Sequence, residues 1–148
     1  MRLVIEVAPG ELIDKITILE LKLQNITDQN QQANVRREYE VLMATFRQAV
    51  EETKTLSDLI EELRSANGRL WTYENEVRRL ELSGDFGDRF IAVARSIYLT
   101  NDERAATKRK INQLFNSALM EEKSYRLEGR AANSHQPSGL LARTTDEA

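Results

Sequence analysis

The sequence predicts an all-α protein with one short N-terminal strand, folded as an antiparallel helical bundle with coiled-coil-like heptad seams. The two prolines are Pro9 and Pro137, so residues 10–136 lack the strongest helix breaker. Apolar residues between them recur at steps of three and four, which is the spacing of a helical seam. The 148 residues are 41% hydrophobic and 30% charged, which suits one domain with a single core.

The N-terminal residues 2–8 alternate in the manner of a strand. One face would carry the apolar side chains Leu3, Ile5 and Val7, and the other Arg2, Val4 and Glu6. No other segment alternates convincingly, so this strand has no obvious partner within the chain. Its backbone could pair with the same strand of a second copy across a dimer axis, or lie as an extended arm along the helices.

The first helix is predicted over residues 10–26, where the apolar seam consists of Leu12, Ile16, Leu19, Leu23 and Ile26. Residues 24–34 are polar and amide-rich, which predicts a loop, and the next helix should begin between residues 28 and 34. A heptad pattern then covers residues 35–81. It predicts either one long helix or two helices that break near residues 53–58, where Thr55 or Ser57 offers an N-cap. We favour the break.

The Ser-Gly-Asp string at 83–85 is the clearest helix stop, and a short helix is predicted over residues 86–98. Thr100 and Glu103 have the spacing of a capping box, so a further helix should start at residue 101 or 102 and end before Gly129.

These predictions divide the chain into a helical domain over residues 1–128 and a C-terminal tail over residues 129–148. The tail is small, polar and contains glycine and proline, so we expect it to be flexible.

The composition argues against several classes of function. Cysteine is absent and the single histidine, His135, lies in the tail, which argues against nucleophilic triads and Cys/His zinc sites. No P-loop or dinucleotide fingerprint is present, so we expect no metal and no cofactor. The net charge of −3 argues against nucleic acid as a partner, and no segment is apolar enough to span a membrane. With no signal-peptide pattern either, we expect a cytoplasmic protein.

A candidate polar cluster lies on or beside the predicted core faces, and its members are Asn67, Trp71, Glu74, Arg78, Arg95 and Asn112. The first four follow steps of four, three and four, so they share one helix stripe. Buried polar groups must pair with one another or with a ligand. The cluster is therefore either a pocket, with Trp71 as a stacking surface and Arg78 or Arg95 binding an anion, or a salt-bridge network that fixes helix register. We favour the network.

Arg104 and Lys108 are candidate anion contacts because they share one face near a predicted helix N-terminus. Asp102 and Glu103 already occupy that positive end of the helix dipole. A solvated, charge-paired face is therefore the favoured interpretation.

Three segments resemble a small family of bacterial and viral proteins of unknown function. They are PGELIDKITILELK (9–22), RLWTYENEVRRLE (69–81) and DFGDRFIAVARSIYLTNDERAATKRKINQLFNSALMEEKSY (85–125). The resemblance implies that such proteins sometimes accompany, or are fused to, glycosyltransferase or tetratricopeptide proteins of surface-polysaccharide pathways. It carries over no catalytic residue.

Two functions follow from these observations. The first is a non-catalytic helical oligomerisation or docking module that self-associates through strand 2–8 or the helical seam. A larger protein partner is also expected, and the resemblance implies surface-polysaccharide glycosyltransferase machinery. The alternative is a small enzyme or ligand-binding protein that acts on an anionic substrate such as a sugar nucleotide or sugar phosphate.

Overall fold

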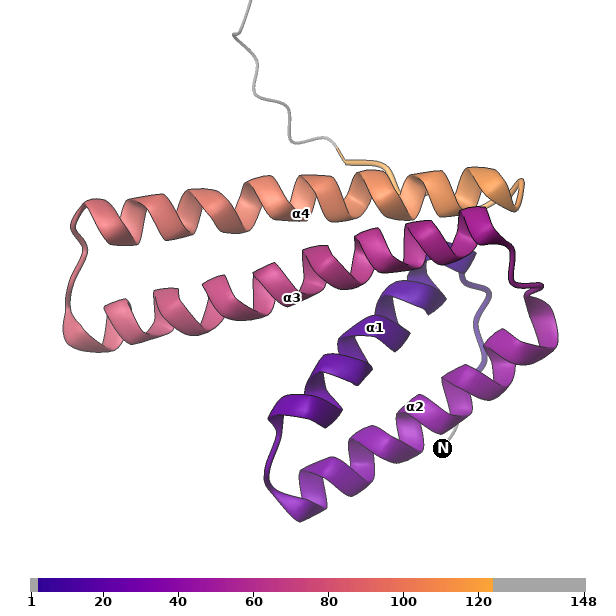
Figure 1. The fold of residues 1–148 in the computed structure, drawn as a ribbon, viewed down its shortest axis with the longest axis horizontal. Coiled ribbons are helices and arrows are strands. Elements are labelled where there is room, and N and C mark those ends of the chain that lie inside the picture. Colours follow the sequence, from indigo (N-terminus) through magenta and orange to yellow (C-terminus); the bar gives the residue numbers. More distant parts are fainter. Residues whose placement is uncertain (1–2, 124–148) are drawn as a thin grey trace, which may run out of the picture.

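The computed structural model describes residues 3–123 and contains four helices over this range: α1 (Pro9–Asn25), α2 (Gln29–Ala49), α3 (Lys54–Ser83) and α4 (Asp88–Leu114). They form two antiparallel hairpins, α1–α2 and α3–α4, which meet at one end and diverge at the other (Figure 1). The prediction of an all-α bundle is confirmed. None of these helices is long and apolar enough to cross a membrane.

Residues 3–8 do not form the predicted strand. They run into α1 without strand pairing, and Ala8 has the extended angles φ −68° and ψ 147°. Alternation of apolar and polar residues favours a strand, but a strand also needs a neighbour for its hydrogen bonds. No strand is assigned anywhere over residues 3–123, and the chain from Pro9 to Leu114 is helical apart from short connections, so residues 3–8 have no strand to pair with.

The helix boundaries follow from capping groups. α2 begins within the predicted interval because the Asp28 side chain accepts a hydrogen bond from the Gln31 N–H at 2.8 Å. The break between α2 and α3 is confirmed, but its cap is Thr53, whose hydroxyl accepts from the Leu56 N–H at 3.2 Å. The predicted caps Thr55 and Ser57 lie inside α3, which begins at Lys54 and buries its first core residue at Leu56.

The two helices predicted over residues 86–127 are one helix, α4, which ends earlier than predicted. Thr100 is buried in the middle of α4, so the capping-box spacing is not used there. The helix ends because Asn116 adopts a left-handed φ of 50°, and the Ser117 N–H bonds the Asn112 carbonyl at 2.9 Å. This is a Schellman ending with asparagine in the position glycine usually takes. Gly129, the predicted stop, and the predicted tail lie outside the described residues.

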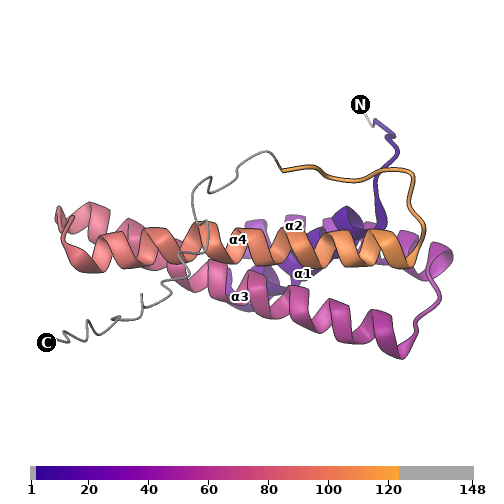
Figure 2. The ribbon, with the colours of Figure 1, turned by 90° about the horizontal axis from the view of Figure 1, so that it is seen from above.

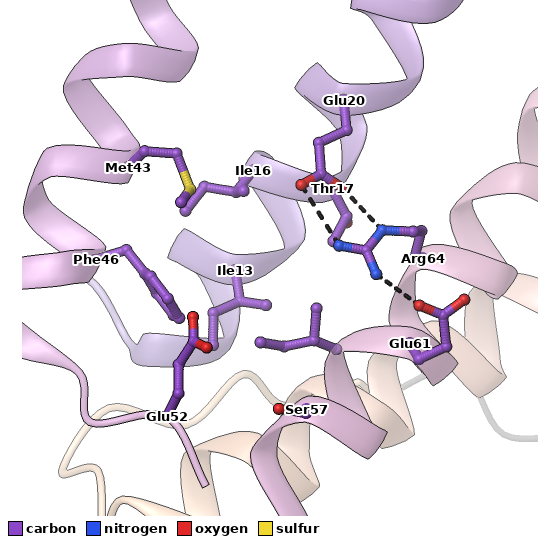
Figure 3. Close-up of a pocket in the computed structure, with 11 residues that line it drawn as sticks. Ile13, Ile16, Thr17, Glu20, Met43, Phe46, Glu52, Ser57, Glu61 and Arg64 are labelled. Carbon is purple, nitrogen blue, oxygen red and sulfur yellow. Dashed lines mark hydrogen bonds and ion pairs between the residues drawn. The ribbon is translucent and has the colours of Figure 1, made fainter. Parts of the chain in front are cut away.

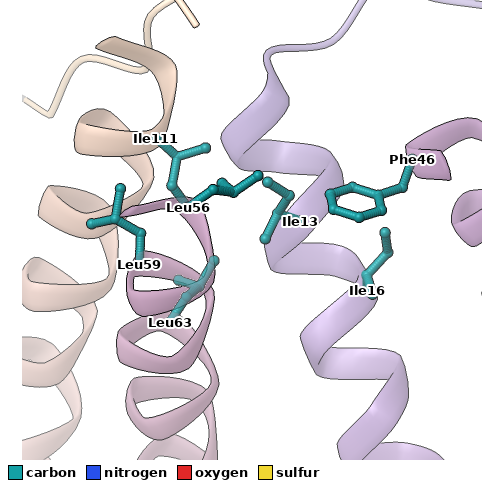
Figure 4. Close-up of a cluster of buried hydrophobic side chains, with 7 residues drawn as sticks. All are labelled: Ile13, Ile16, Phe46, Leu56, Leu59, Leu63 and Ile111. Carbon is teal, nitrogen blue, oxygen red and sulfur yellow. The ribbon is translucent and has the colours of Figure 1, made fainter. Parts of the chain in front are cut away.

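The hydrophobic core lies where the two hairpins meet and draws on all four helices (Figure 4). Its buried members are Ile13, Ile16, Phe46, Leu56, Leu59, Leu63 and Ile111. α1 is the central helix, since it packs against each of the other three, whereas α2 packs against α1 alone among the four. The position of α1 therefore decides how the two hairpins are held together.

Candidate functional site

A buried polar network joins α1 to α3 and α4 beside the core. Asp14 is only 3% exposed, and its carboxylate accepts two hydrogen bonds from the Arg104 guanidinium, one of them 2.9 Å from Nε. The Asn67 amide nitrogen also donates to Asp14 Oδ1 at 2.8 Å and to Thr17 Oγ1 at 2.9 Å. The hydrogen bond to Asp14 raises the pKa of Arg104, so this guanidinium stays charged. The network fixes the crossing of three helices.

A groove with a volume of about 270 Å³ opens next to this network. Its lining comes from α1, α3 and α4 and comprises Ile18, Leu21, Asn67, Leu70, Trp71, Glu74, Asn75, Arg78, Asn101 and Arg104. Glu74 and Arg78 form an ion pair within α3, and the Arg78 guanidinium also donates to the Glu74 carbonyl at 2.8 Å. The stripe from Asn67 to Arg78 therefore lines one surface.

Two members of the candidate cluster lie elsewhere. Arg95 is exposed and does not line the groove. Asn112 is buried where α4 meets the N-terminus of α1, and its side-chain oxygen accepts a hydrogen bond from the Gly10 N–H at 2.7 Å. Asn112 thus satisfies a donor at the start of a helix that has no side-chain cap from Ala8.

Carboxylates from the chain itself neutralise both predicted anion contacts. Arg104 pairs with Asp14, as above, and Lys108 pairs with Glu11 and with Glu121, the latter at 2.6 Å. Burial opposes the charge on Lys108, whose side chain is 8% exposed, but these hydrogen bonds outweigh burial and raise its pKa. The same contact lowers the pKa of Glu121.

The Glu121 contact belongs to a segment, residues 115–123, that turns back along α4 (Figure 2). Lys123 continues it by pairing with Asp102 at 3.1 Å, and Arg109 pairs with Glu122. The charged side chains on this face of α4 therefore each have a partner of opposite charge in residues 115–123.

A second cavity, of about 360 Å³, lies between α1, α2 and α3 (Figure 3). Its wall is apolar near Phe46 and Met43, and at its rim Arg64 donates to Glu20 at 2.8 Å and to Glu61 at 2.6 Å. The hydrogen bond that Arg64 donates to Glu20 raises the pKa of Arg64. The sequence analysis did not identify this cavity.

The predicted polar cluster does not include Asp14 and Thr17, the α1 members of the network. The signal was available, because each follows a core isoleucine, Ile13 or Ile16, and so sits at the edge of the buried face. The seam assigned to α1 placed Leu12 in the core, whereas Ile13 is the fully buried residue. Because the predicted seam used Leu12 instead of Ile13, the predicted buried face did not include Asp14. Over residues 3–123, no three His, Cys, Asp or Glu side chains are arranged to hold a metal ion.

Fold and site together define an all-α protein whose central helix is held by a buried carboxylate–arginine–amide network. The chain belongs to a family of unknown function, DUF6165, whose model matches residues 3–139. No curated protein and no solved structure matches the chain.

Proposed function

We propose that this protein is a non-catalytic helical docking module that self-associates through its N-terminal segment. One observation carries the proposal: four large apolar side chains in residues 3–7 are exposed, Leu3 by 77%, Val4 by 82%, Ile5 by 77% and Val7 by 48%. Several large apolar side chains exposed within one short segment are typical of an interaction site. Its extended backbone also offers unpaired donors and acceptors, which favours pairing with another strand.

A second copy of the chain supplies a matching strand. In an antiparallel pair centred on Val4, residue numbers of opposed residues add up to eight, so Leu3 faces Ile5 and Arg2 faces Glu6 of the other copy. Opposite charges face each other twice across the two-fold axis, which favours this register. Leu3, Ile5 and Val7 of both copies then lie on one face, available to cover apolar surface of the helices.

A charge exchange tests the register. Arg2→Glu and Glu6→Arg each place like charges opposite one another at two positions, and the double variant restores attraction. Each cross-strand pair contributes about 0.2–1 kcal/mol, and each single variant disrupts two pairs. Each should therefore weaken the dimer about two- to thirtyfold, and the double variant should recover the wild-type affinity. The measurement is mass by light scattering over a range of concentrations.

Two results would contradict the proposal. One is a monomer at every concentration. The other is a dimer that survives deletion of residues 1–7, since the helical seam would then be the surface of association. Ile5→Lys serves as a second variant, because a charge on the apolar face should abolish the pairing without touching a buried residue of the helical domain.

As part of the same proposal, the dimer docks onto a larger protein in the cytoplasm. The resemblance of the sequence implies a glycosyltransferase of a surface-polysaccharide pathway, and the lack of cysteine is compatible with a reducing compartment. Affinity capture with the wild-type chain should recover this class of enzyme, and capture with Ile5→Lys should not. Equal recovery by both would place docking outside residues 3–7.

The alternative, a protein acting on an anionic substrate, stays a prediction. Its support is the groove that gathers Asn67, Trp71, Glu74 and Arg78. An anion there would compete with Glu74 for Arg78 and with Asp14 for Arg104, and for that reason we prefer docking.

A further inference from the structure

We propose that the groove beside Trp71 binds one uncharged sugar ring, a role separate from docking through residues 3–7. The groove lies between α1 and α3, with α4 at its edge, and holds about 270 Å³. That volume is just below the range of about 300–1,000 Å³ for small-molecule sites. It suits a single ring better than an extended substrate.

The amide oxygen of Asn67 has no hydrogen-bond donor among residues 3–123. Asn67 is 4% exposed, and its amide nitrogen donates to Asp14 Oδ1 and Thr17 Oγ1. A carboxylate only accepts, so this contact fixes the amide and turns its oxygen away from Asp14. No fully buried side-chain nitrogen or oxygen in the described chain lacks a partner, so this oxygen is not fully enclosed, and we assign it to the groove that Asn67 lines. A ligand hydroxyl would satisfy it.

The two arginines that line the groove are already paired with carboxylates. Arg104 is neutralised by the buried Asp14, and Arg78 by Glu74 on the preceding turn. An anionic ligand would have to displace a carboxylate, and a cationic ligand would meet two guanidinium groups. A neutral hydroxyl can donate or accept without breaking either pair. The ionic network therefore favours an uncharged ligand.

The lining of the groove combines a flat apolar surface with amide groups. Trp71 is half-buried in the lining, beside the apolar residues Ile18 and Leu21 of α1. The C–H face of a sugar ring packs against such an aromatic surface. Asn75 and Asn101 bring further amide groups from α3 and α4, which suit hydroxyls that project from a ring in several directions.

Trp71 is the only tryptophan of the chain, so its fluorescence reports directly on this groove. The full chain is titrated with the methyl α-glycosides of glucose, galactose and mannose, and with glucose 1-phosphate and adenosine for comparison. We expect a saturable change in emission with at least one neutral glycoside. The proposal is overturned if no neutral glycoside gives saturation, or if only glucose 1-phosphate or adenosine does.

Variants locate the site. Trp71→Ala and Asn75→Ala should each weaken binding of the responding glycoside about three- to tenfold by calorimetry, and the exposed Arg95→Ala, outside the groove, should leave it unchanged. If circular dichroism shows that Trp71→Ala is misfolded, the affinity of Asn75→Ala alone tests the location of the site. Equal affinity of Asn75→Ala and wild type would overturn the assignment. Ile5→Lys should bind the glycoside normally, which separates this test from that of docking.

Discussion

Replacing Asp14 with alanine should destabilise the protein far more than removing an exposed ion pair. The substitution leaves the Arg104 guanidinium without its carboxylate, and the Asn67 amide with Thr17 as its remaining acceptor. Asp14 sits on the central helix, so the loss weakens the contacts that hold α1 to both helices of the other hairpin.

The magnitude follows from burial. A hydrogen bond to a charged group contributes about 1.5–3 kcal/mol, and breaking a buried ion pair costs about 3–5 kcal/mol. The Arg104 side chain retains 27% exposure and can recover part of its hydration, so we reduce the expected loss to about 2–4 kcal/mol. For a domain of this size that is a fall of about 5–12 °C in melting temperature.

Urea unfolding followed by circular dichroism, at one fixed protein concentration, measures this loss. Glu74→Ala is the matched control, because it breaks the exposed Glu74–Arg78 pair and should cost less than about 1 kcal/mol. The double variant of Asp14 and Arg104 should lose less than the sum of its single variants. The reasoning fails if Asp14→Ala costs no more than Glu74→Ala, or if the two losses simply add.

Three further predictions concern the rest of the fold. Gly10→Ala should lower the free energy of unfolding by about 1–3 kcal/mol, because its new Cβ would lie 2.7 Å from a backbone oxygen of α4. Gly68 has open space around it, so Gly68→Ala should raise the free energy of unfolding by about 0.5–1 kcal/mol. Phe46→Ala should cost about 3–5 kcal/mol in the same assay, because Phe46 is the buried core residue that α2 supplies; a loss below 1 kcal/mol would contradict this. The lowered pKa of Glu121 means that its contact with Lys108 stabilises the fold above the ordinary carboxyl pKa of 4.5 and is lost as the pH falls through the lowered value. Glu121→Gln should therefore have a lower melting temperature than the wild type at neutral pH and the same melting temperature in acid. An equal difference in melting temperature at both pH values would refute the linkage.

The helical architecture could be predicted because its signals are local. The stop at residues 83–85 works through Gly84, which adopts a φ of 68° that other residues avoid. The break between α2 and α3 follows from a polar stretch with a capping hydroxyl, and only the choice of Thr53 among several hydroxyls needed the structure.

The errors arise where a local pattern competes with tertiary context. Thr100 and Glu103 have capping-box spacing, but nothing between residues 88 and 114 breaks a helix, and Thr100 is buried by packing instead. Residues 3–8 have the alternation of a strand, yet pairing requires a neighbour that α-helical residues cannot supply. Neither outcome is encoded within the segment itself.

The candidate site was predictable along one helix and not between helices. The stripe from Asn67 to Arg78 is a matter of helical spacing, and the structure places it on one groove. The partners Asp14 and Arg104 are 90 residues apart in sequence, and no spacing rule connects them. The position of Asn112 beside an apolar face predicts that it joins the same cluster, but its side chain accepts a hydrogen bond at the start of α1 instead.

Asn67 couples the two halves of the site, since its amide nitrogen bonds Asp14 and Thr17 and the residue also lines the groove. A hydrophobic side chain at this position would remove one member of the buried network and leave the others in place, which costs stability. It would leave Asp14 with one partner fewer and the groove without the Asn67 amide. A ligand hydroxyl bound to the oxygen would be held by the same amide that joins α1 to α3. Occupancy of the groove should therefore raise the stability of that helix crossing by mass action.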